Sequence, residues 1–323
     1  MKRFTNILVV FNDAIGAEDA LEQAVSLARD NAARLTVTVV LRGGESSPQL
    51  VAETEKRLQR LSLGVQHAGV SDVRTLVLTG IPFLVIIQQV IRAEHDLVLA
   101  CAESDGVLKQ IFFGSTATHL VRKCPCPVWI VKPGQTVPYT KILVAVDPHN
   151  ASPEDQFNTL IMDLATSLAV HDNAVLHIMH AWGIDGNDLD SLRSEIATQQ
   201  REAILKRHHD KHLLAVNNLL TRYPMSEIDH RVHLPKGRPE QAISQLVRQE
   251  QIDLIVMGSV ARVGIPGFFI GNTAETVLSS ERCSILTVKP NGFETPVSLS
   301  QYSQSLNGYG FQPKAMIASI GLL

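Results

Sequence analysis

Short apolar runs rich in Val, Ile and Leu alternate along the chain with longer segments in which apolar residues recur at helical spacing. The runs are apolar at consecutive positions, which is typical of strands buried on both faces of a sheet. Ala17 to Asn31 and Asp155 to Val170 are the first helical segments of the two halves. Strands that alternate with helices of this length predict parallel sheets covered by helices.

The second half of the chain repeats the first half in the same order. Five strand-like runs return: Asn6 to Asn12 as Lys141 to Asp147, Arg34 to Leu41 as Ala174 to Trp182, the run from Arg74 as that from His230, the run from His95 as that from Ile252, and Val128 to Val131 as Ile285 to Val288. A Gly-x-Pro follows the third run in both halves, at Gly80-Ile81-Pro82 and Gly237-Arg238-Pro239, and proline suits the first turn of a helix. A repeat of this length predicts two copies of one α/β domain.

The repeat also sets the expected domain boundaries. The first copy covers residues 1–134 and the second covers residues 141–292. Residues 135–140 form a short linker with prolines close by at Pro133 and Pro138, which keeps the two copies adjacent. Residues 293–323 lose the periodicity and match nothing in the first copy, so we expect an appended tail.

Composition excludes several classes of partner. Of the 323 residues 45% are hydrophobic, and the formal net charge is −3 with both signs spread along the chain. A protein without a one-sided positive field lacks the footprint of a nucleic-acid binder. The apolar runs are of strand length, so no membrane span is expected.

The chain ends and the cysteines point to the cytoplasm. The apolar run near the N-terminus breaks at Asn12 and Asp13, which is too short for the core of a signal peptide. The four cysteines form no CxxC pair and no regular framework, as is typical of a reducing compartment. We therefore expect a cytoplasmic protein.

The segment Gly258 to Thr273 of the second copy is the candidate for ligand chemistry. It reads Gly-Ser-Val-Ala-Arg-Val-Gly-Ile-Pro-Gly-Phe-Phe-Ile-Gly-Asn-Thr and leads into the last helix. Glycine is needed where a backbone approaches a phosphate closely or adopts positive φ. The amides of Gly271, Asn272 and Thr273 open that helix, where unpaired N–H groups and the helix dipole favour an anion.

With the Gly-x-Pro helix, the Asp-Leu-Ile-Val-Met-Gly strand and the Gly-Asn-Thr-Ala-Glu helix in this order, the chain resembles the universal stress protein family in its tandem, two-domain form. The resemblance covers roughly Arg3 to Lys132 and Lys141 to Lys289. It implies two doubly wound five-stranded parallel-sheet domains of the adenine nucleotide alpha hydrolase-like kind. It also implies an intramolecular pseudo-dimer in which Val128 to Val131 and Ile285 to Val288 pair antiparallel, so that two sheet edges are covered.

Many members of this family bind ATP, and their motif is Gly-x-x-Gly, nine residues, then Gly-Ser or Gly-Thr. Gly258 and Gly271 fall on family glycines, whereas Ala261 replaces the second glycine and Asn272 replaces the hydroxyl residue. Gly264 and Thr273 belong to the same loop and helix start. The resemblance implies that this loop holds the phosphates of ATP.

The adenosine end of the ligand is assigned by the same resemblance. Asp147, at the end of the first strand of the second copy, matches the acidic residue that meets adenosine in the family. A carboxylate there accepts hydrogen bonds from ribose hydroxyls or from the adenine amine. Ile178 falls where family members contact adenine through backbone groups.

The first copy has lost most of these features. Asn12 stands for the aspartate, Cys101 and Ser104 stand for the two loop glycines, and only Gly114-Ser115 remains at the helix start. Glu103 and Asp105 add negative charge where phosphates would lie. We therefore expect ATP in the C-terminal domain only.

Other residues carry metal-type spacing, but structural interpretations are favoured for all of them. Cys124 and Cys126 with nearby His119 are explained as small buried residues entering the last strand, and His208 and His212 as part of a solvated, charge-rich helix. His177 and His180 fall on opposite faces of a strand. A metal site is therefore not expected. Asp96 and Asp253 precede apolar strands in both copies, and structural capping explains them as well as function does. Phe112, Phe113, Phe268 and Phe269 are interpreted as core or interface residues, with the lining of an apolar ligand cavity as the alternative.

Three functions remain open at this stage. The first is a regulatory stress-response protein that binds an adenine nucleotide in its second domain, acting alone as a pseudo-dimer or as a homodimer, with protein partners unknown. The second is an interaction scaffold that binds no nucleotide. The third is a carrier of another small ligand, lipid-like or metal-linked. No catalytic triad, paired carboxylates or Walker-type Gly-Lys-Ser is present, so at most weak ATP hydrolysis is expected.

Overall fold

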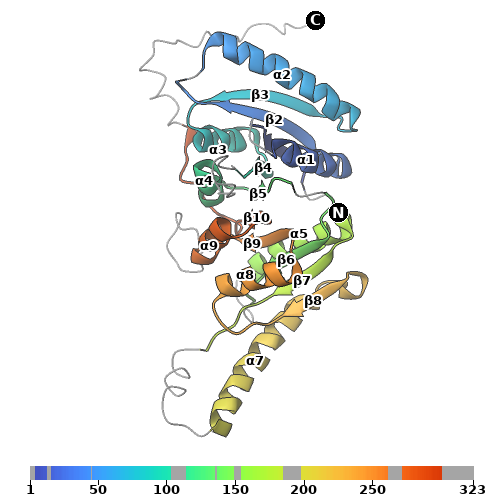
Figure 1. Ribbon diagram of the computed structural model, residues 1–323, viewed down its shortest axis with the longest axis vertical. Helices are drawn as coiled ribbons and strands as arrows, with labels where there is room; N and C mark the ends of the chain where they lie inside the picture. The colour runs from blue at the N-terminus through green and yellow to red at the C-terminus, as the bar shows by residue number, and fades with distance from the viewer. Residues whose placement is uncertain are drawn as a thin grey trace, which may run out of the picture.

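The computed structural model describes residues 4–12, 16–44, 46–102, 114–134, 137–148, 154–184, 198–260 and 271–299. Within them, ten strands form one sheet in the order β3-β2-β1-β4-β5-β10-β9-β6-β7-β8. Each copy contributes five strands, and the two sets meet at β5 and β10 in the middle of the elongated molecule (Figure 1). The fold class predicted from the repeat is confirmed.

The first copy alternates strands and helices as the hydrophobic pattern predicts. Its elements are β1 (Asn6–Val10), α1 (Ala17–Asn31), β2 (Arg34–Leu41), α2 (Pro48–His67), β3 (Val73–Thr79), α3 (Pro82–Ala93), β4 (Leu97–Cys101), α4 (Ser115–Lys123) and β5 (Val128–Val131).

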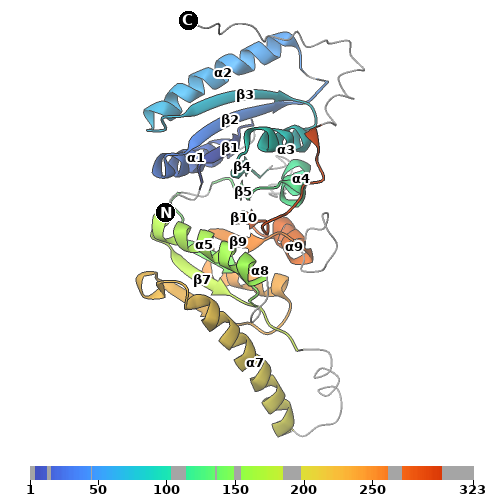
Figure 2. The same cartoon turned by 180° about the vertical axis from the view of Figure 1, so that it is seen from behind.

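The second copy has the same order with a longer excursion after its second strand. Its elements are β6 (Lys141–Ala145), α5 (Glu154–Asp172), β7 (Val175–Met179), α7 (Thr198–Leu220), the 3-10 helix η1 (Met225–Glu227), β8 (His230–His233), α8 (Pro239–Glu250), β9 (Leu254–Gly258), α9 (Asn272–Ser280) and β10 (Ser284–Val288). The first part of α7 extends beyond the body of the domain (Figures 1 and 2).

All pairings inside each copy are parallel, and the pairing between the copies is antiparallel. Trp129 of β5 faces Leu286 of β10, and these are equivalent positions of the repeat. The seam between β5 and β10 therefore passes through a local two-fold axis, as expected for a pseudo-dimer. The predicted pairing of the final strands is confirmed.

Helices cover both faces of the sheet. The helices α1, α2, α5 and α7 pack on one face, and α3, α4, α8 and α9 pack on the other. Each of the two hydrophobic clusters beneath them contains residues from both copies. The core is therefore continuous across the seam rather than divided between two separate domains.

Two partly buried aspartates, Asp96 and Asp253, act as caps at the starts of strands. The carboxylate of Asp96 accepts hydrogen bonds from the backbone N–H groups of Thr5 and Asn6, and that of Asp253 accepts them from Thr140 and Lys141. The same cap thus starts the first strand of each copy. The structural interpretation of both aspartates is confirmed.

The chain beyond β10 returns to the first copy. Val297 is buried in the cluster beneath α3 and α4, and the carbonyl of Ser298 accepts a hydrogen bond of 3.1 Å from the Gln88 side chain. The start of the predicted tail therefore ties the end of the second copy to α3. The domain boundaries themselves stay predictions.

A second contact between the copies depends on pH. The ring nitrogens of His171 lie 2.5 Å from carboxylate oxygens of Asp30 in the first copy and Asp172 in the second. Burial alone would lower the pKa of His171, but the hydrogen bonds and charges of the two aspartates outweigh it and raise that pKa. The charged imidazole thus links the ends of α1 and α5.

We therefore expect this link to be lost in mild alkali. A histidine whose pKa is raised in the folded state stabilises the protein fully below its unfolded pKa of about 6.5, and that stability disappears as pH rises through the folded pKa. The free energy of unfolding of the protein and of its His171→Gln variant, measured by denaturant between pH 5.5 and 8.5, should differ most at the acid end. A difference that stays constant or grows with pH would contradict this assignment.

Candidate functional site

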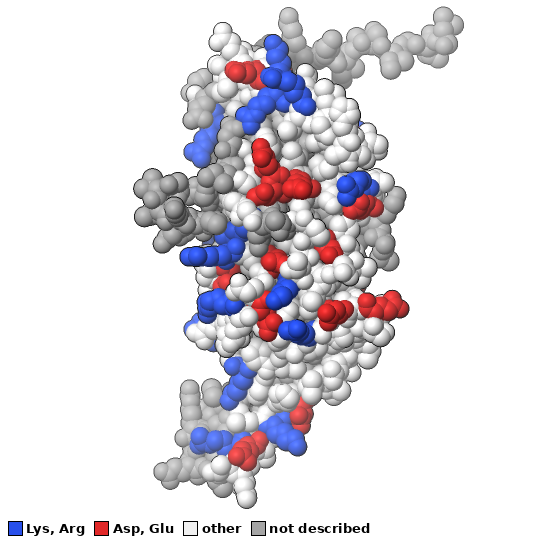
Figure 3. Space-filling model, turned by 45° about the vertical axis from the view of Figure 1, so that its right-hand side comes forward, with Lys and Arg blue, Asp and Glu red and all other residues white. Residues whose placement is uncertain are grey.

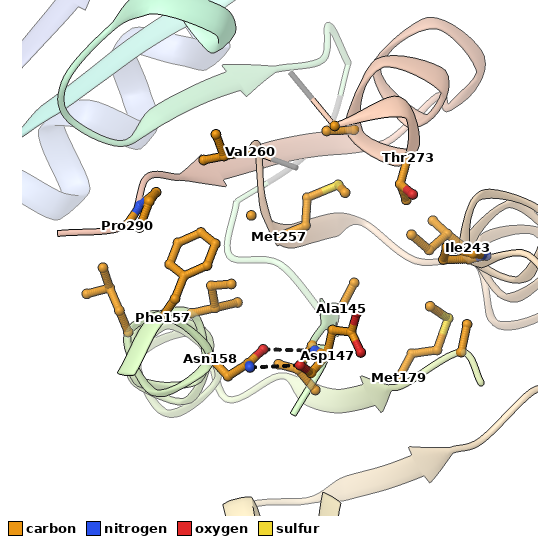
Figure 4. Close-up of a pocket in the computed structure, with 18 of the residues that line it drawn as sticks. Ala145, Asp147, Phe157, Asn158, Met179, Ile243, Met257, Val260, Thr273 and Pro290 are labelled. Atoms are coloured by element: carbon orange, nitrogen blue, oxygen red, sulfur yellow. Dashed lines mark hydrogen bonds between the residues drawn. The ribbon is translucent and has the colours of Figure 1, made fainter. Parts of the chain in front are cut away.

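A cavity of about 720 Å³ opens at the carboxyl ends of the strands of the second copy. It lies between α5, α8 and the start of α9, above β6 and β9 (Figure 4). β6 and β9 are neighbours, and the chain leaves them toward opposite faces of the sheet. Ligands of open α/β sheets bind at such a switch point, and a cavity of 300–1,000 Å³ is typical of a small-molecule site.

Asp147 lies at the floor of this cavity, directly after β6. Asn158 of α5 holds the backbone there, since its side chain accepts from the N–H of Asp147 at 2.8 Å and donates to the carbonyl of Asp147 at 3.0 Å (Figure 4). The Asp147 side chain is 51% exposed and lies 3.5 Å from Nδ1 of His180. A solvated carboxylate on a fixed backbone is available to accept hydrogen bonds from a ligand.

The opposite wall is the start of α9. Gly271 is the N-cap of that helix, no side chain caps it, and its own N–H donates to the carbonyl of Ser259 at 3.0 Å. The amides of the first turn have no acceptor within the helix. Because Asn272 and Thr273 line the cavity, these amides and the positive end of the helix dipole are presented to it.

Gly258 has a different local reason to be glycine from the one the motif suggested. A Cβ built at Gly258 would lie 2.7 Å from Cε1 of Phe157, well inside van der Waals contact. The Phe157 ring, from the first turn of α5, therefore packs directly on the Gly258 backbone at one end of the cavity. Gly258 makes room for this ring, whatever it does for a ligand.

The structure brings five of the eight predicted site residues into the lining of one cavity: Asp147, Gly258, Gly271, Asn272 and Thr273. Ile178 is fully buried in the core on the side of the sheet that α5 covers and is not in this lining, whereas the nearby Met179 and Ala181 are. Ala261 and Gly264 lie outside the described residues, as do Phe268 and Phe269.

Several lining residues carried no signal in the sequence. The apolar part of the cavity is formed by Phe157, Met179, Ile243 and Met257. The alternation of β7 was the one usable sign, since it sends the side chain of Met179 to the face opposite Ile178. Phe157, Asn158 and Ile243 come from helices, and only the packing of those helices places them at the site.

Four histidines of the second copy lie close together in two pairs. Nδ1 of His177 lies 3.1 Å from Nε2 of His233, and Nε2 of His180 lies 2.7 Å from Nδ1 of His212. Among the described residues, no group of three or more His, Cys, Asp or Glu side chains is arranged to hold a metal ion. Burial is the main cause that lowers the pKa of His177, to about 4, so this pair is neutral at pH 7.

The prediction of a solvated helix around His208 and His212 was wrong at His208, which is buried, and holds only in part at His212, which is half-buried. His208 is 4% exposed, and His212 contacts His180 of the adjacent chain segment. The helix itself was predicted correctly. The charged residues at other positions of α7 made the whole segment look solvated, although one of its faces packs against the sheet. The start of α7, from Thr198 to Ala203, is exposed as expected.

The equivalent corner of the first copy is different. Cys101 ends β4 at the position of Gly258, and burial raises the pKa of its thiol to about 12, so the thiol is protonated at pH 7. Ser104, Glu103 and Asp105 lie outside the described residues, as do Phe112 and Phe113. Cys124 and Cys126 are buried at the entry to β5, with their sulfurs 3.6 Å apart.

Within the described ranges, no helix is long and apolar enough to cross a membrane. On the face shown in Figure 3, acidic and basic side chains are interspersed, and no broad basic surface is visible there.

Comparison with known proteins agrees with the fold and the repeat. The model of the universal stress protein family matches residues 3–132 and again residues 138–289. The chain is 35% identical over 236 residues to Universal stress protein E of Salmonella typhi, which covers 72% of this chain and 73% of that protein. It is 29% identical over 318 residues to Universal stress protein E of Photorhabdus laumondii, at 93% and 100% coverage.

Solved structures show the same two-domain arrangement. A functionally unknown protein from Pseudomonas aeruginosa PAO1 superposes with a TM-score of 0.73 at 23% identity, covering 90% of this chain and 95% of that one. A universal stress protein from Archaeoglobus fulgidus gives a TM-score of 0.61 at 18% identity, with 88% and 98% coverage. The family model accounts for both halves, and the relatives are similar over most of their length, so the chain belongs to the universal stress protein family and carries the family's domain twice.

Proposed function

We propose that the cavity of the second copy binds an adenine nucleotide, ATP in the first instance, and that the protein acts as a cytoplasmic regulator in the stress response rather than as a catalyst. The observation that carries the proposal is the meeting of Asp147 and the uncapped start of α9 in one cavity of about 720 Å³. Asp147 supplies a carboxylate that can bind a nucleoside, and the start of α9, far away in the sequence, supplies backbone amides that can bind an anion.

The chemistry of the lining fits such a ligand. The Asp147 carboxylate accepts hydrogen bonds from ribose hydroxyls or an adenine amine, and the amides of Asn272 and Thr273 donate to phosphate oxygens. Met179, Ile243 and Met257 offer apolar contacts to a base. The family resemblance supports the same orientation, with Gly258 and Gly271 toward the phosphates and the Ile178 region toward adenine.

Replacing Asp147 by alanine tests the adenosine end. The variant loses one charge-assisted hydrogen-bonding group, worth about 1.5–3 kcal/mol, so calorimetry should show ATP affinity falling about ten-fold or more. The fold should survive, because Asn158 bonds the backbone of Asp147 and not its carboxylate. A variant that binds ATP as tightly as the original chain would remove Asp147 from the site.

The two copies should differ in stoichiometry. Asn12 lacks the carboxylate of Asp147 and Cys101 replaces Gly258, so calorimetry should give one nucleotide per chain. Replacing Asp147 should then weaken the single binding event as a whole rather than half of the signal. Two equivalent sites per chain would show that the first copy keeps a working pocket.

A scaffold without nucleotide is the second candidate, and it has an observation of its own. Phe157 occupies the space next to Gly258, and Ala261 and Asn272 depart from the family motif. Native mass spectrometry of gently purified protein separates the candidates, because a retained ATP, AMP, lipid or metal mass identifies the occupant. Restoring the motif with Ala261→Gly and Asn272→Ser should tighten ATP binding if these departures weaken the site, and should leave a scaffold empty.

A further inference from the structure

A buried lysine crosses the seam between the two copies close to this cavity. Lys289 directly follows β10 and is 6% exposed. Its ammonium donates to the carbonyl oxygens of Val121 at 2.6 Å and Arg122 at 3.3 Å, and to the hydroxyl of Ser259 at 2.7 Å. An ammonium has three donors, and these acceptors match them in number.

The two ends of this contact belong to different copies. Val121 and Arg122 lie in the last turn of α4 in the first copy, where exposed carbonyls and the negative end of the helix dipole attract a cation. Ser259 belongs to the second copy and lies between Gly258 and Val260, both of which line the cavity. Lys289 therefore joins the end of α4 to the wall of the cavity.

Ser259 connects Lys289 to the start of α9, at the end of the cavity where we expect an anion to bind. Its carbonyl accepts the N–H of Gly271, the N-cap of α9, at 3.0 Å, and its own N–H donates to Val288 at 3.1 Å. Ser259 is fully buried. The position of the first turn of α9 relative to β9 thus depends on a serine whose hydroxyl is held by Lys289.

The first copy provides a natural comparison. Lys132 occupies the position equivalent to Lys289 and is likewise buried, at 1% exposed. Ala102 occupies the position of Ser259, and its N–H donates to Val131 as that of Ser259 does to Val288. Alanine carries no hydroxyl, so the hydrogen bond between Lys289 and Ser259 has no equivalent at this position of the first copy.

We propose that Lys289 is a positioning residue through which the first copy holds the phosphate end of the second copy's cavity in place. The inference deepens the proposed function and rests on it. The first copy, which we expect to bind no nucleotide, contributes to nucleotide binding in the second copy. Such coupling between separate parts of a protein typically changes affinity by five-fold to about a hundred-fold.

The test compares ATP and adenosine affinities of three variants by calorimetry. Lys289→Met keeps the apolar stem and removes the ammonium, Ser259→Ala removes the hydroxyl while the lysine keeps both carbonyls, and Lys132→Met is the matched control. We expect the first two to lower ATP affinity about five-fold or more, with a smaller change for adenosine, and the double variant to be no worse than Lys289→Met. Lys132→Met should bind like the original chain.

A pH profile separates positioning from a merely structural role. Burial is the main cause that lowers the pKa of Lys289, to about 8. Among the described groups, its ammonium faces the Cys124 thiol, the two α4 carbonyls, the Ser259 hydroxyl and the Phe293 ring, whose centroid lies 4.6 Å away. ATP affinity should therefore fall between pH 7 and 9.5 in the original chain and in Lys132→Met, but not in Lys289→Met.

Amide hydrogen exchange tests, without any ligand, whether Lys289 and Ser259 hold the start of α9 in place. The amides of Gly271 and Glu275, which bond to Ser259 and Gly271 respectively, should exchange faster in Ser259→Ala and Lys289→Met than in Lys132→Met. If the original chain binds no nucleotide, the proposed function fails. The exchange rates alone then test whether Lys289 and Ser259 position the start of α9. Equal exchange in all variants, or ATP binding with unchanged affinity in Ser259→Ala and Lys289→Met, overturns the inference.

Discussion

Replacing Trp129 by alanine is expected to lower the free energy of unfolding by about 3–5 kcal/mol, as for other large aromatic residues in a core. Trp129 is fully buried in β5, faces Leu286 across the seam, and stacks on Tyr139 with ring centroids 5.8 Å apart. The loss should fall on the whole molecule, because the clusters on both faces of the sheet contain residues of both copies.

Chemical denaturation followed by circular dichroism measures this change. The original chain should unfold in one transition, and Trp129→Ala should move that transition as a unit. Leu63→Ala is the control, since Leu63 is 56% exposed and should change stability by about 0.5 kcal/mol or less. Two transitions of which only one responds to Trp129→Ala would show that the copies fold independently and that the seam is a weak contact.

The second large effect is expected at Gly258, where valine should disable the cavity. Its Cβ would lie 2.7 Å from Cε1 and 2.8 Å from Cζ of Phe157, so the ring has to move. Overpacking of this kind costs about 1–3 kcal/mol. A displaced ring and two added methyl groups at the cavity wall should reduce ATP affinity at least ten-fold.

Phe157→Ala separates the two causes of that loss. In the double variant Gly258→Val, Phe157→Ala the clash is relieved, and the melting temperature should recover toward that of Phe157→Ala alone. Gly183→Val is the matched control, because a Cβ at Gly183 meets nothing within 4 Å. If Gly258→Val binds ATP normally, the ligand does not occupy this end of the cavity and the scaffold proposal gains support.

These two positions show why the same cavity is consistent with two functions. The Gly258 backbone meets an aromatic ring of its own chain, whereas the start of α9 presents amides that no side chain caps. The first feature needs no ligand, and the second is typical of an anion site. Affinity measurements on Asp147, Ser259 and Lys289 variants therefore carry more weight for function than the glycine pattern alone.

The two-fold repeat and the alternation of strands and helices could be predicted from the residues alone, because both depend on local periodicity and on the similarity of the two copies. The antiparallel pairing of β5 with β10 was implied by the family resemblance. Asp147 was assigned from the family resemblance, and Gly271, Asn272 and Thr273 from the resemblance and the chemistry of a helix start; the structure places all four in the lining of one cavity.

Only the tertiary structure decided which neighbours complete the site and connect it to the first copy. Phe157 and Asn158 lie on α5, Ile243 lies on α8, and their places at the cavity depend on how those helices pack, which local periodicity does not encode. The burial of His208 and the contact of His212 with His180 are further cases, since α7 carries charges on its other faces. Lys132 and Lys289 occupy equivalent positions of the repeat, but Lys289 bonds the hydroxyl of Ser259, whereas the equivalent position of the first copy is Ala102.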